Sequence, residues 1–258
     1  MIKYKEEAAM IDKRIELEHW ETEHTMNYHR KQFLEPKRST VAFEKFLTQY
    51  RDIDNSNILD LACGGGAVEL YFTQLHPRLK IHGVDIIDKS FSLLKEFTDI
   101  NERKNITLTQ GDWYNLSNDF VGKYDGVISL QSLSWLEDWK VPIEKICRLN
   151  PDWIAMSSLF YEGKINYQIK LKDYEIPTES RLYQETYYNI YSIPMIKEYL
   201  QEWGYTDFKY EPFDIDIDLE KPDHMDAQTY TIKTEDGSRI QISGAMLMPW
   251  YFIYASKR

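Results

Sequence analysis

Three consecutive glycines, Gly64 to Gly66, join an apolar segment that contains Asp60 to an amphipathic segment. Glycine has no Cβ atom, so such a loop can turn sharply and bring its backbone close to a ligand. The apolar segment has the composition of a buried strand, and the amphipathic segment repeats its apolar residues at the spacing of a helix packed on a sheet. Those residues are Val68, Tyr71, Phe72 and Leu75. This order of strand, loop and helix is typical of a site that holds a cofactor.

The spacing of the glycines does not fit the two commonest phosphate-binding loops. A dinucleotide fingerprint requires G-x-G-x-x-G, but the frame that starts at Gly64 continues with Gly66 and then Glu69. A carboxylate at this place would repel a bound pyrophosphate, and no Gly-Lys-Ser or Gly-Lys-Thr follows the loop. Asp60 favours a ligand that carries positive charge, such as an amino group or a sulfonium.

Three aspartates stand at the ends of successive predicted strands: Asp60, Asp85 and Asp112. Ligands of open α/β sheets bind outside the carboxyl ends of the strands. Asp85 follows the glycines by about 20 residues, the separation at which a carboxylate accepts bonds from ribose hydroxyls. Asp112 could accept a bond from an adenine amine, with Trp113 as a flat apolar wall. Each aspartate alone also fits a structural role, as a turn residue, a strand end or a loop cap.

Four segments, in this order, resemble the motifs of the class I S-adenosylmethionine-dependent methyltransferase family. They are Leu59-Asp-Leu-Ala-Cys-Gly-Gly-Gly66, Gly83-Val-Asp85, Gly111-Asp-Trp113 and Tyr124-Asp-Gly-Val-Ile-Ser-Leu-Gln131. The resemblance covers residues 58–158. It implies S-adenosylmethionine as the cofactor, S-adenosylhomocysteine as the product, and an α/β fold with a Rossmann-like, seven-stranded, mostly parallel sheet. In that fold the last strand is antiparallel and helices flank the sheet.

The same resemblance implies roles for individual residues. Gly64 and Gly66 approach the methionine part of the cofactor, Asp85 holds the ribose, and Asp112 contacts the adenine. Leu130 accepts a bond from the cofactor's amino group through its backbone carbonyl. The full set expected to bind the cofactor is Asp60, Ala62, Gly64, Gly66, Asp85, Ile86, Asp112, Trp113 and Leu130.

One segment departs from part of the family. Members that methylate DNA bases or protein amides often carry Asn-Pro-Pro-Tyr or a similar motif after the fourth strand, where this chain has Ser129-Leu-Gln-Ser-Leu-Ser134. This difference argues against methylation of a base or a glutamine. The net charge of −11 would also repel a phosphate backbone. The basic pairs Arg30-Lys31 and Lys37-Arg38 are interpreted as solvated surface charges. No nucleic acid partner is expected.

Methyl transfer from a sulfonium is an in-line displacement, so alignment of donor and acceptor and exclusion of water matter most. A hydroxyl acceptor usually needs a general base, and His29 and His19 are the candidates. An amine acceptor needs only to be neutral, which leaves open that no side chain acts as a base. No metal site is expected, because His19, His24 and His29 are spaced by five residues and do not share a helix face.

The acceptor site is expected to lie in segments outside the cofactor motifs. Aromatic residues are frequent after residue 150, and they suit the wall of a small-molecule pocket. The candidates for acceptor binding are Tyr28, Gln131, Trp135, Tyr161, Tyr188, Asn189 and Trp250. For each of them, ordinary packing is the alternative.

The order of predicted elements indicates one α/β domain with additions. Residues 1–50 are expected to form a helical N-terminal cap, and residues 51–258 the catalytic domain, in which strands and helices alternate from residue 58. Residues 160–191 are expected to form a substrate lid. Residues 228–243 are expected to form a β-hairpin, and Met246 to Tyr254 the final strand.

Composition limits the class of protein further. Cys63 and Cys147 show no disulfide framework, so a cytoplasmic location is expected. No apolar run approaches the ~20 residues of a membrane span, and no membrane partner is expected. A monomer or a homodimer is expected. The predicted function is methyl transfer to an oxygen or nitrogen of a small polar metabolite, such as a sugar, a nucleotide-linked compound or a secondary metabolite. The alternatives are a nucleoside-binding protein without turnover and a nicotinamide-dependent enzyme with an atypical glycine loop.

Overall fold

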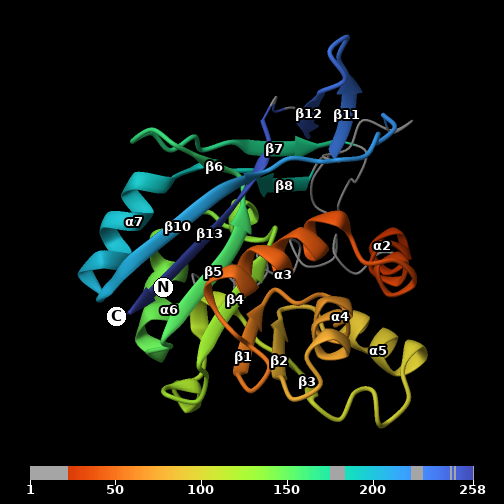
Figure 1. The fold of residues 1–258 in the computed structure, drawn as a ribbon, viewed down its shortest axis with the longest axis vertical. Coiled ribbons are helices and arrows are strands. Elements are labelled where there is room, and N and C mark those ends of the chain that lie inside the picture. Colours follow the sequence, from red (N-terminus) through yellow and green to blue (C-terminus); the bar gives the residue numbers. More distant parts are fainter. Residues whose placement is uncertain (1–22, 175–183, 222–228, 245, 247, 258) are drawn as a thin grey trace, which may run out of the picture.

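A seven-stranded sheet forms the centre of the computed structural model, which describes residues 23–174, 184–221, 229–244, 246 and 248–257. The strand order is β10-β13-β5-β4-β1-β2-β3 (Figure 1). The strands are β1 (Asn57–Leu61), β2 (Lys80–Asp85), β3 (Ile106–Gln110), β4 (Gly126–Leu130), β5 (Trp153–Ser158), β10 (Tyr205–Phe213) and β13 (Trp250–Lys257).

The last strand runs against the rest of the sheet. Strands β1 to β5 pair in parallel, and β13 pairs antiparallel with both β5 and β10. This confirms the expected α/β sheet with an antiparallel last strand. The final strand begins at Trp250 and not at Met246, because Met246 forms an isolated bridge with Ser243 before the strand starts. The apolar character of residues 246–249 misplaced the predicted boundary.

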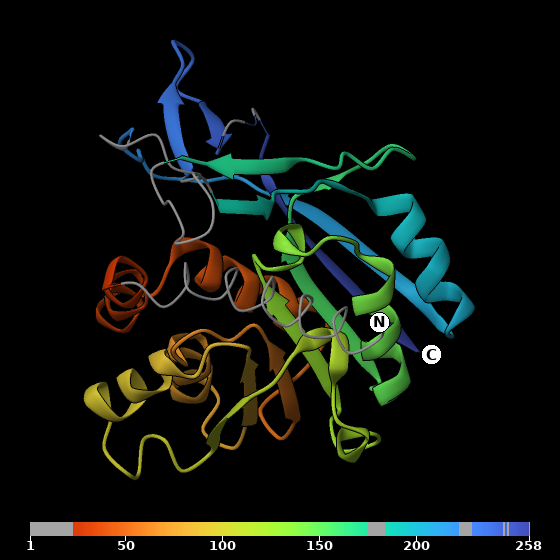
Figure 2. The same ribbon diagram turned by 180° about the vertical axis from the view of Figure 1, so that it is seen from behind.

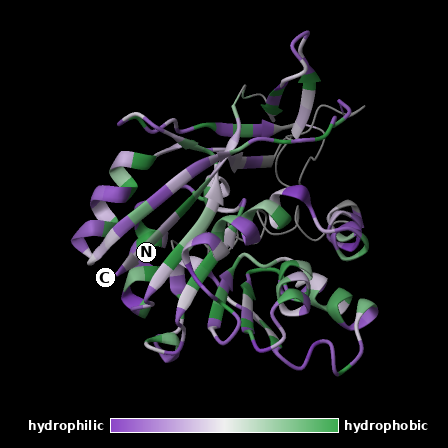
Figure 3. Cartoon of the chain, viewed as in Figure 1, coloured by the Kyte–Doolittle hydropathy of each residue, from purple (hydrophilic) through white to green (hydrophobic). Residues whose placement is uncertain are grey.

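Helices flank the sheet, and its central strands are buried on both faces. Ile58 and Leu59 are both fully buried in β1, where successive side chains point to opposite faces. Ile58 packs with the aromatic residues of α3 (Arg38–Tyr50) and α4 (Ala67–Leu75), whereas Leu59 packs with the aliphatic residues of α6 (Lys140–Leu149) and α7 (Ile193–Glu202). The strands accordingly contain long hydrophobic runs (Figure 3).

Helix α2 (Glu23–Leu34) lies beside α4 and α5 (Ser92–Phe97), as Figures 1 and 2 both show. The Phe33 ring stacks on Phe97 with a centroid separation of 5.1 Å. Arg30 Nε donates to Glu96 Oε1 at 3.3 Å. The described part of the expected cap, residues 23–50, therefore consists of two helices, one of which is attached to the helices that follow β1 and β2.

Short strands occupy the segments between the main elements. Residues 160–192 contribute β6 (Phe160–Tyr161), β7 (Lys170–Asp173), β8 (Gln184–Tyr187) and β9 (Tyr191–Ser192), which pair as β6–β9 and β7–β8. Strands β11 (Thr229–Lys233) and β12 (Arg239–Ser243) pair antiparallel, as predicted for the hairpin. Single turns of 3-10 helix cover Lys89–Phe91, Trp113–Asn115, Asn118–Phe120 and Leu133–Trp135. Among the described residues, no helix is both long and apolar enough to cross a bilayer.

Candidate active site

The glycine loop joins the carboxyl end of β1 to the N-terminus of α4. Gly64 and Gly66 have φ values of 59° and 92°, in the left-handed region that favours glycine. Ala62 also has a positive φ, of 62°, which is uncommon for a residue with a side chain. The Ala62 amide donates to the carbonyl of Val84 at 2.7 Å. The start of the loop is thus tied to β2.

The imidazole of His29 rests against Gly64. A Cβ atom added to Gly64 would lie 2.5 Å from Cε1 and 2.8 Å from Nδ1 of His29. No side chain therefore fits at position 64 while His29 keeps its place. Helix α2 brings a predicted base residue onto the predicted cofactor loop. The other predicted base, His19, lies outside the described residues.

Burial and a neighbouring cation keep His29 neutral. Burial lowers the pKa of His29 to about 4, and the ammonium of Lys37 acts in the same direction. The Tyr28 ring lies edge-on to the imidazole, with the centroids 5.2 Å apart. A neutral imidazole at pH 7 can accept a proton, which is what a general base must do.

Asp85 fastens the glycine loop from the end of β2. Its Oδ2 accepts a bond from the Gly64 amide at 2.8 Å, and its Oδ1 accepts one from the Ile87 amide at 2.9 Å. Burial raises the pKa of Asp85, and these backbone bonds act in the opposite direction. Because each carboxylate oxygen has two lone pairs, both retain capacity for a ligand hydroxyl. The adjacent Ile86 is 38% exposed, so its side chain is open to a ligand.

The carboxyl groups of Asp60 and Glu69 are buried beneath the loop. Asp60 is 1% exposed and Glu69 is 0% exposed. Neither oxygen of Glu69, nor Oδ1 of Asp60, has a hydrogen-bond partner. Burial raises the pKa of both groups, that of Glu69 to about 8, and the interaction with Glu69 raises the pKa of Asp60 further. Such a pair tolerates burial when one member holds a proton and donates it to the other.

The position of Glu69 corrects the expectation that it would repel a pyrophosphate from the loop. Its side chain points to the sheet, and a Cβ atom on Gly83 of β2 would lie 2.3 Å from Glu69 Oε1. The absence of a Cβ at Gly83 makes room for this carboxyl group. The buried residues of α4 are Glu69, Leu70, Phe72 and Thr73. Of the predicted stripe, Phe72 is therefore confirmed, Val68 and Tyr71 are half-buried, and Leu75 is exposed.

Three predicted cofactor residues have structural partners. Asp112 Oδ1 accepts a bond from the Tyr114 amide at 2.9 Å, which makes Asp112 the cap of a short helical turn. Trp113 is 6% exposed, and its indole N–H donates to the Pro142 carbonyl at 3.1 Å. This burial corrects the expectation of a flat wall for adenine, because the indole belongs to the core under α6. The carbonyl of Leu130, at the end of β4, accepts a bond from Ser132 Oγ at 2.9 Å.

Lys37 connects two of the predicted acceptor residues. Its ammonium contacts the hydroxyl of Tyr28 and lies 4.3 Å from the centroid of the Tyr28 ring. It also donates to Gln131 Oε1 at 3.4 Å. Gln131 has a φ of 57° at the end of β4, and such strained residues gather at functional sites. Lys37 was interpreted from the sequence as a solvated charge, but it is half-buried.

Three predicted acceptor residues form an aromatic row. The Trp135 and Tyr188 rings have centroids 4.9 Å apart, and the Tyr188 and Trp250 rings 6.4 Å apart. Tyr188 is 2% exposed, and its hydroxyl has no hydrogen-bond partner. Burial raises the pKa of Tyr188, and the phenol of Tyr28 acts in the same direction. The aromatic row therefore lies close enough to Tyr28, which contacts Lys37, for the Tyr28 phenol to affect the pKa of Tyr188.

The remaining two acceptor candidates lie in different surroundings. Asn189 is fully buried, and its amide donates to the Leu136 carbonyl at 2.8 Å while its Oδ1 accepts from the Ile169 amide at 2.8 Å. These bonds tie β8 and β9 to the turn after β4 and favour a structural role. Tyr161 is 39% exposed and lies edge-on to Tyr167, with the ring centroids 5.6 Å apart.

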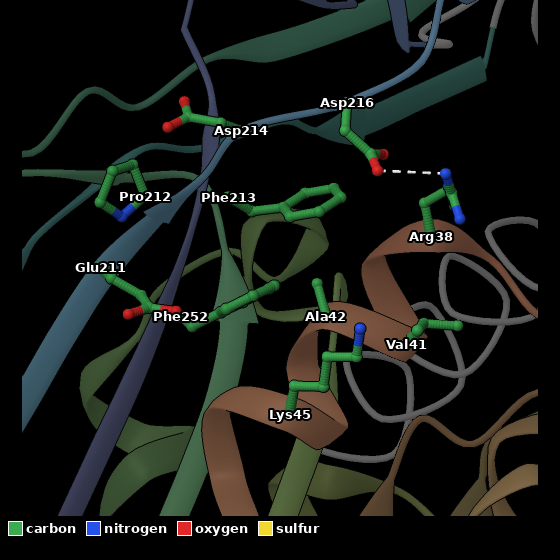
Figure 4. Close-up of a pocket in the computed structure, with 10 residues that line it drawn as sticks. All are labelled: Arg38, Val41, Ala42, Lys45, Glu211, Pro212, Phe213, Asp214, Asp216 and Phe252. Atoms are coloured by element: carbon green, nitrogen blue, oxygen red, sulfur yellow. Dashed lines mark hydrogen bonds and ion pairs between the residues drawn. The ribbon is translucent and has the colours of Figure 1, made fainter. Parts of the chain in front are cut away.

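A surface pocket of about 530 Å³ lies away from the glycine loop, between α3 and the strands β10 and β13 (Figure 4). Its lining mixes charges of both signs, and the Arg38–Asp216 ion pair at 3.1 Å spans it. It contains none of the predicted site residues, and its acidic and basic groups give no common ligand chemistry. Within the described part of the chain, no group of three or more His, Cys, Asp or Glu residues could hold a metal ion.

A family model described as a methyltransferase domain matches residues 52–203, more than half of the chain. The chain belongs to this methyltransferase domain family. The match confirms the resemblance to class I S-adenosylmethionine-dependent methyltransferases that the motifs predicted. The methyltransferase segment includes the glycine loop, Asp85, Asp112 and the Gln131 turn, whereas His29 and Lys37 precede it.

Curated relatives match part of the methyltransferase segment. The release factor glutamine methyltransferase of Aliivibrio fischeri is 31% identical over 94 residues, which are 36% of this chain and 33% of that protein. The chain thus spans about a third of the length of the curated relatives it matches.

Solved structures share the methyltransferase fold. Human N-acetylserotonin methyltransferase in complex with S-adenosylmethionine has a TM-score of 0.51 and 14% identity, over 91% of this chain and 57% of that one. The glycopeptide N-methyltransferase MtfA in complex with S-adenosylmethionine has a TM-score of 0.50 and 13% identity, over 87% of this chain and 96% of that one. At these identities the likeness shows the fold alone.

The contact between His29 and Gly64 predicts a specific response to substitution. Gly64→Ala and Gly122→Ala both place a side chain at positive φ, 59° and 67°, at a backbone cost of about 1–2 kcal/mol. Nothing lies within 4 Å of a Cβ on Gly122. Gly64→Ala should therefore destabilise the protein more, by a further ~1–3 kcal/mol from overpacking, as measured by denaturant unfolding. His29→Ala should relieve this extra cost in a double-mutant cycle. Equal destabilisation by the two glycine substitutions would contradict the contact.

The buried acidic pair predicts how stability depends on pH. Because the pKa of Glu69 is raised from 4.5 to about 8, its contribution is fully present below pH 4.5 and is lost as the pH rises towards 8. A pKa that differs by one between the folded and the unfolded protein corresponds to about 1.4 kcal/mol of unfolding free energy. Glu69→Gln should weaken the loss of unfolding free energy between pH 5 and 8. The exposed Glu202→Gln on α7 is the matched control. A wild-type pH slope in Glu69→Gln would refute the assignment.

Proposed function

We propose that this protein is an S-adenosylmethionine-dependent methyltransferase that acts on an oxygen or nitrogen of a small polar metabolite. Family membership supports the cofactor and the class of reaction. The observation that carries the acceptor is the arrangement of neutral His29, Lys37 and Gln131 beside the glycine loop. The aromatic row of Trp135, Tyr188 and Trp250 supplies an apolar wall of the kind that small-molecule sites use.

The residues of the loop fit this cofactor. Gly64 and Gly66 expose backbone without Cβ atoms, and both oxygens of Asp85 retain lone pairs for ribose hydroxyls. Asp60 lies beneath the loop with a raised pKa, and an ammonium or a sulfonium bound nearby would favour its ionised form. The Leu130 carbonyl is at the end of β4, where it could accept a bond from the amino group.

When bound, the cofactor would supply a methyl group activated by the sulfonium, for in-line transfer to a lone pair of the acceptor. His29 takes the proton that a hydroxyl acceptor releases. Lys37 favours the neutral form of His29 before transfer. The aromatic row and α2 exclude water from the acceptor, and Gln131 orients its polar groups.

A protein acceptor is the second candidate, because the curated relatives are named release factor glutamine methyltransferases. The segment after β4 speaks against it. Ser134 is fully buried, and its hydroxyl lies 2.5 Å from that of Ser158 while accepting from the Leu159 amide at 3.0 Å. This turn carries no Asn-Pro-Pro-Tyr motif to hold a planar amide. The net charge of −11 likewise supports an acceptor other than nucleic acid.

We place the protein in the cytoplasm as a monomer or homodimer. Cys63 and Cys147 are both free and buried, which is compatible with a reducing compartment. The expected lid, residues 160–191, remains part of this proposal, since β8 leads directly into the Tyr188 of the aromatic row.

Calorimetric titration with S-adenosylmethionine and with NAD tests the identity of the cofactor. S-adenosylmethionine should bind at micromolar concentrations and NAD should not; the reverse result would sink the proposal. Asp85→Ala should weaken binding at least tenfold, because it removes the ribose acceptor and the bond to the Gly64 amide. Asp88→Ala, exposed three residues further along, should leave the affinity unchanged. Unaltered affinity in Asp85→Ala would refute the ribose assignment. Release of S-adenosylhomocysteine over hydroxyl, amine and glutamine-peptide acceptors separates turnover from binding.

The neutrality of His29 predicts the pH profile of methyl transfer. With a pKa of about 4 in the free protein, His29 is unprotonated throughout pH 5.5–9, so kcat/KM for a hydroxyl acceptor should show no acid limb from His29 in that range. His29→Gln should lower kcat by about 10²–10⁴-fold while the affinity for S-adenosylmethionine changes little. If His29→Gln retains the wild-type kcat, no side chain at this position acts as the base.

A further inference from the structure

Lys37 is half-buried, and in the described part of the chain no negative charge compensates its ammonium. Its polar contacts are the Tyr28 hydroxyl and Gln131 Oε1, both neutral oxygens. Among the described residues, no carboxylate lies within ion-pair distance of Lys37. The neighbouring cations differ, because Arg30 pairs with Glu96 at 3.3 Å and Arg38 with Asp216 at 3.1 Å.

An uncompensated cation in a partly desolvated place costs free energy unless a ligand supplies the opposite charge. Its surroundings favour such a ligand. Lys37 is also the N-cap of α3, whose start no side chain caps, so the positive end of a 13-residue helix adds to the ammonium. The Gln131 amide, held at the end of β4 by its backbone bond to Ser157 at 2.8 Å, offers N–H donors to the same ligand.

We propose that Lys37, Gln131 and the start of α3 form a subsite for an anionic oxygen group, a carboxylate or a phosphate, on the methyl acceptor. The subsite depends on the proposed function in one respect only, namely that the anion it binds belongs to the methyl acceptor. It specifies that the acceptor is an anion with a planar or apolar body, which lies along Trp135 and Tyr188.

Binding of the anion has a consequence for His29. The charge of Lys37 faces His29 and, with burial, lowers its pKa. An anion on Lys37 offsets that charge and adds a negative one, so His29 becomes a stronger base when the acceptor is in place. The other groups that contact Lys37 are the Tyr28 phenol and the Gln131 amide, and neither is a carboxylate.

The His29 imidazole reports directly on the subsite in the full-length protein. Its NMR titration is assigned by the signal that His29→Gln removes. Benzoate and phenyl phosphate are the anionic probes, and benzamide is the neutral isostere of benzoate. We expect benzoate or phenyl phosphate to raise the pKa of His29 by about one unit or more, and benzamide to leave it unchanged. The stronger of the two anions identifies the subsite as a carboxylate or a phosphate site.

Substitutions attribute the response to Lys37. Lys37→Met should raise the pKa of His29 in the free protein and abolish the response to both anions. Lys31→Met, an exposed lysine on α2, should respond as the wild type does. Lys37→Gln is a second variant for the same test as Lys37→Met, and circular dichroism checks that the variants are folded.

Two results would overturn the proposal: an equal response to benzamide, or an anion response that survives in Lys37→Met. Calorimetry with S-adenosylmethionine separates this outcome from failure of the proposed function. Lys37→Met should bind S-adenosylmethionine as the wild type does. If the wild type does not bind S-adenosylmethionine but still responds to the anions, the proposed methyltransferase function is refuted and the proposed subsite is not.

Discussion

The contact between His29 and Gly64 is the constraint on which the arrangement of the site depends. Gly64 is held from below by the bond between its amide and Asp85, and from above by the imidazole of His29. The contact with His29 requires residue 64 to lack a Cβ atom, and its φ of 59° lies in the left-handed region that favours glycine. Because α2 carries His29, the docking of α2 on α4 and α5 sets the distance between the cofactor loop and the residues that face the acceptor.

Charge is distributed unevenly across this contact. Asp60 and Glu69 lie beneath the glycine loop in the core, whereas the ammonium of Lys37 lies on the side of α2. The acidic pair tolerates burial because its raised pKa values favour the protonated, uncharged form, and Gly83 provides the space for it. The raised pKa values of the acidic pair keep it largely protonated without a ligand, and a cationic ligand on the loop would favour its ionised form, whereas an anion would be drawn towards Lys37.

Strand positions were predictable because parallel strands are apolar on both faces, and β1 begins at Asn57, one residue from the position at which the alternation of strands and helices was expected to start. The charged residues were not. Glu69 and Lys37 are polar types that usually lie in solvent, and tertiary packing overrode this preference. The buried face of α4 was misassigned because Glu69 occupies it. The opposite error was made for Trp113. This aromatic residue lies next to the motif residue Asp112 and was assigned to the ligand, but its side chain is buried in the core under α6.

The low pKa of His29 poses a chemical question, because a strongly weakened base accepts a proton poorly. Burial and Lys37 keep the imidazole unprotonated, but the same effects oppose the imidazolium that would form on proton transfer. In the proposed subsite, an acceptor anion on Lys37 would remove part of that opposition at the moment when a proton has to be taken. The free protein would then hold His29 neutral, and the bound acceptor would restore its basicity. Both effects would follow from one lysine that has no carboxylate partner among the described residues.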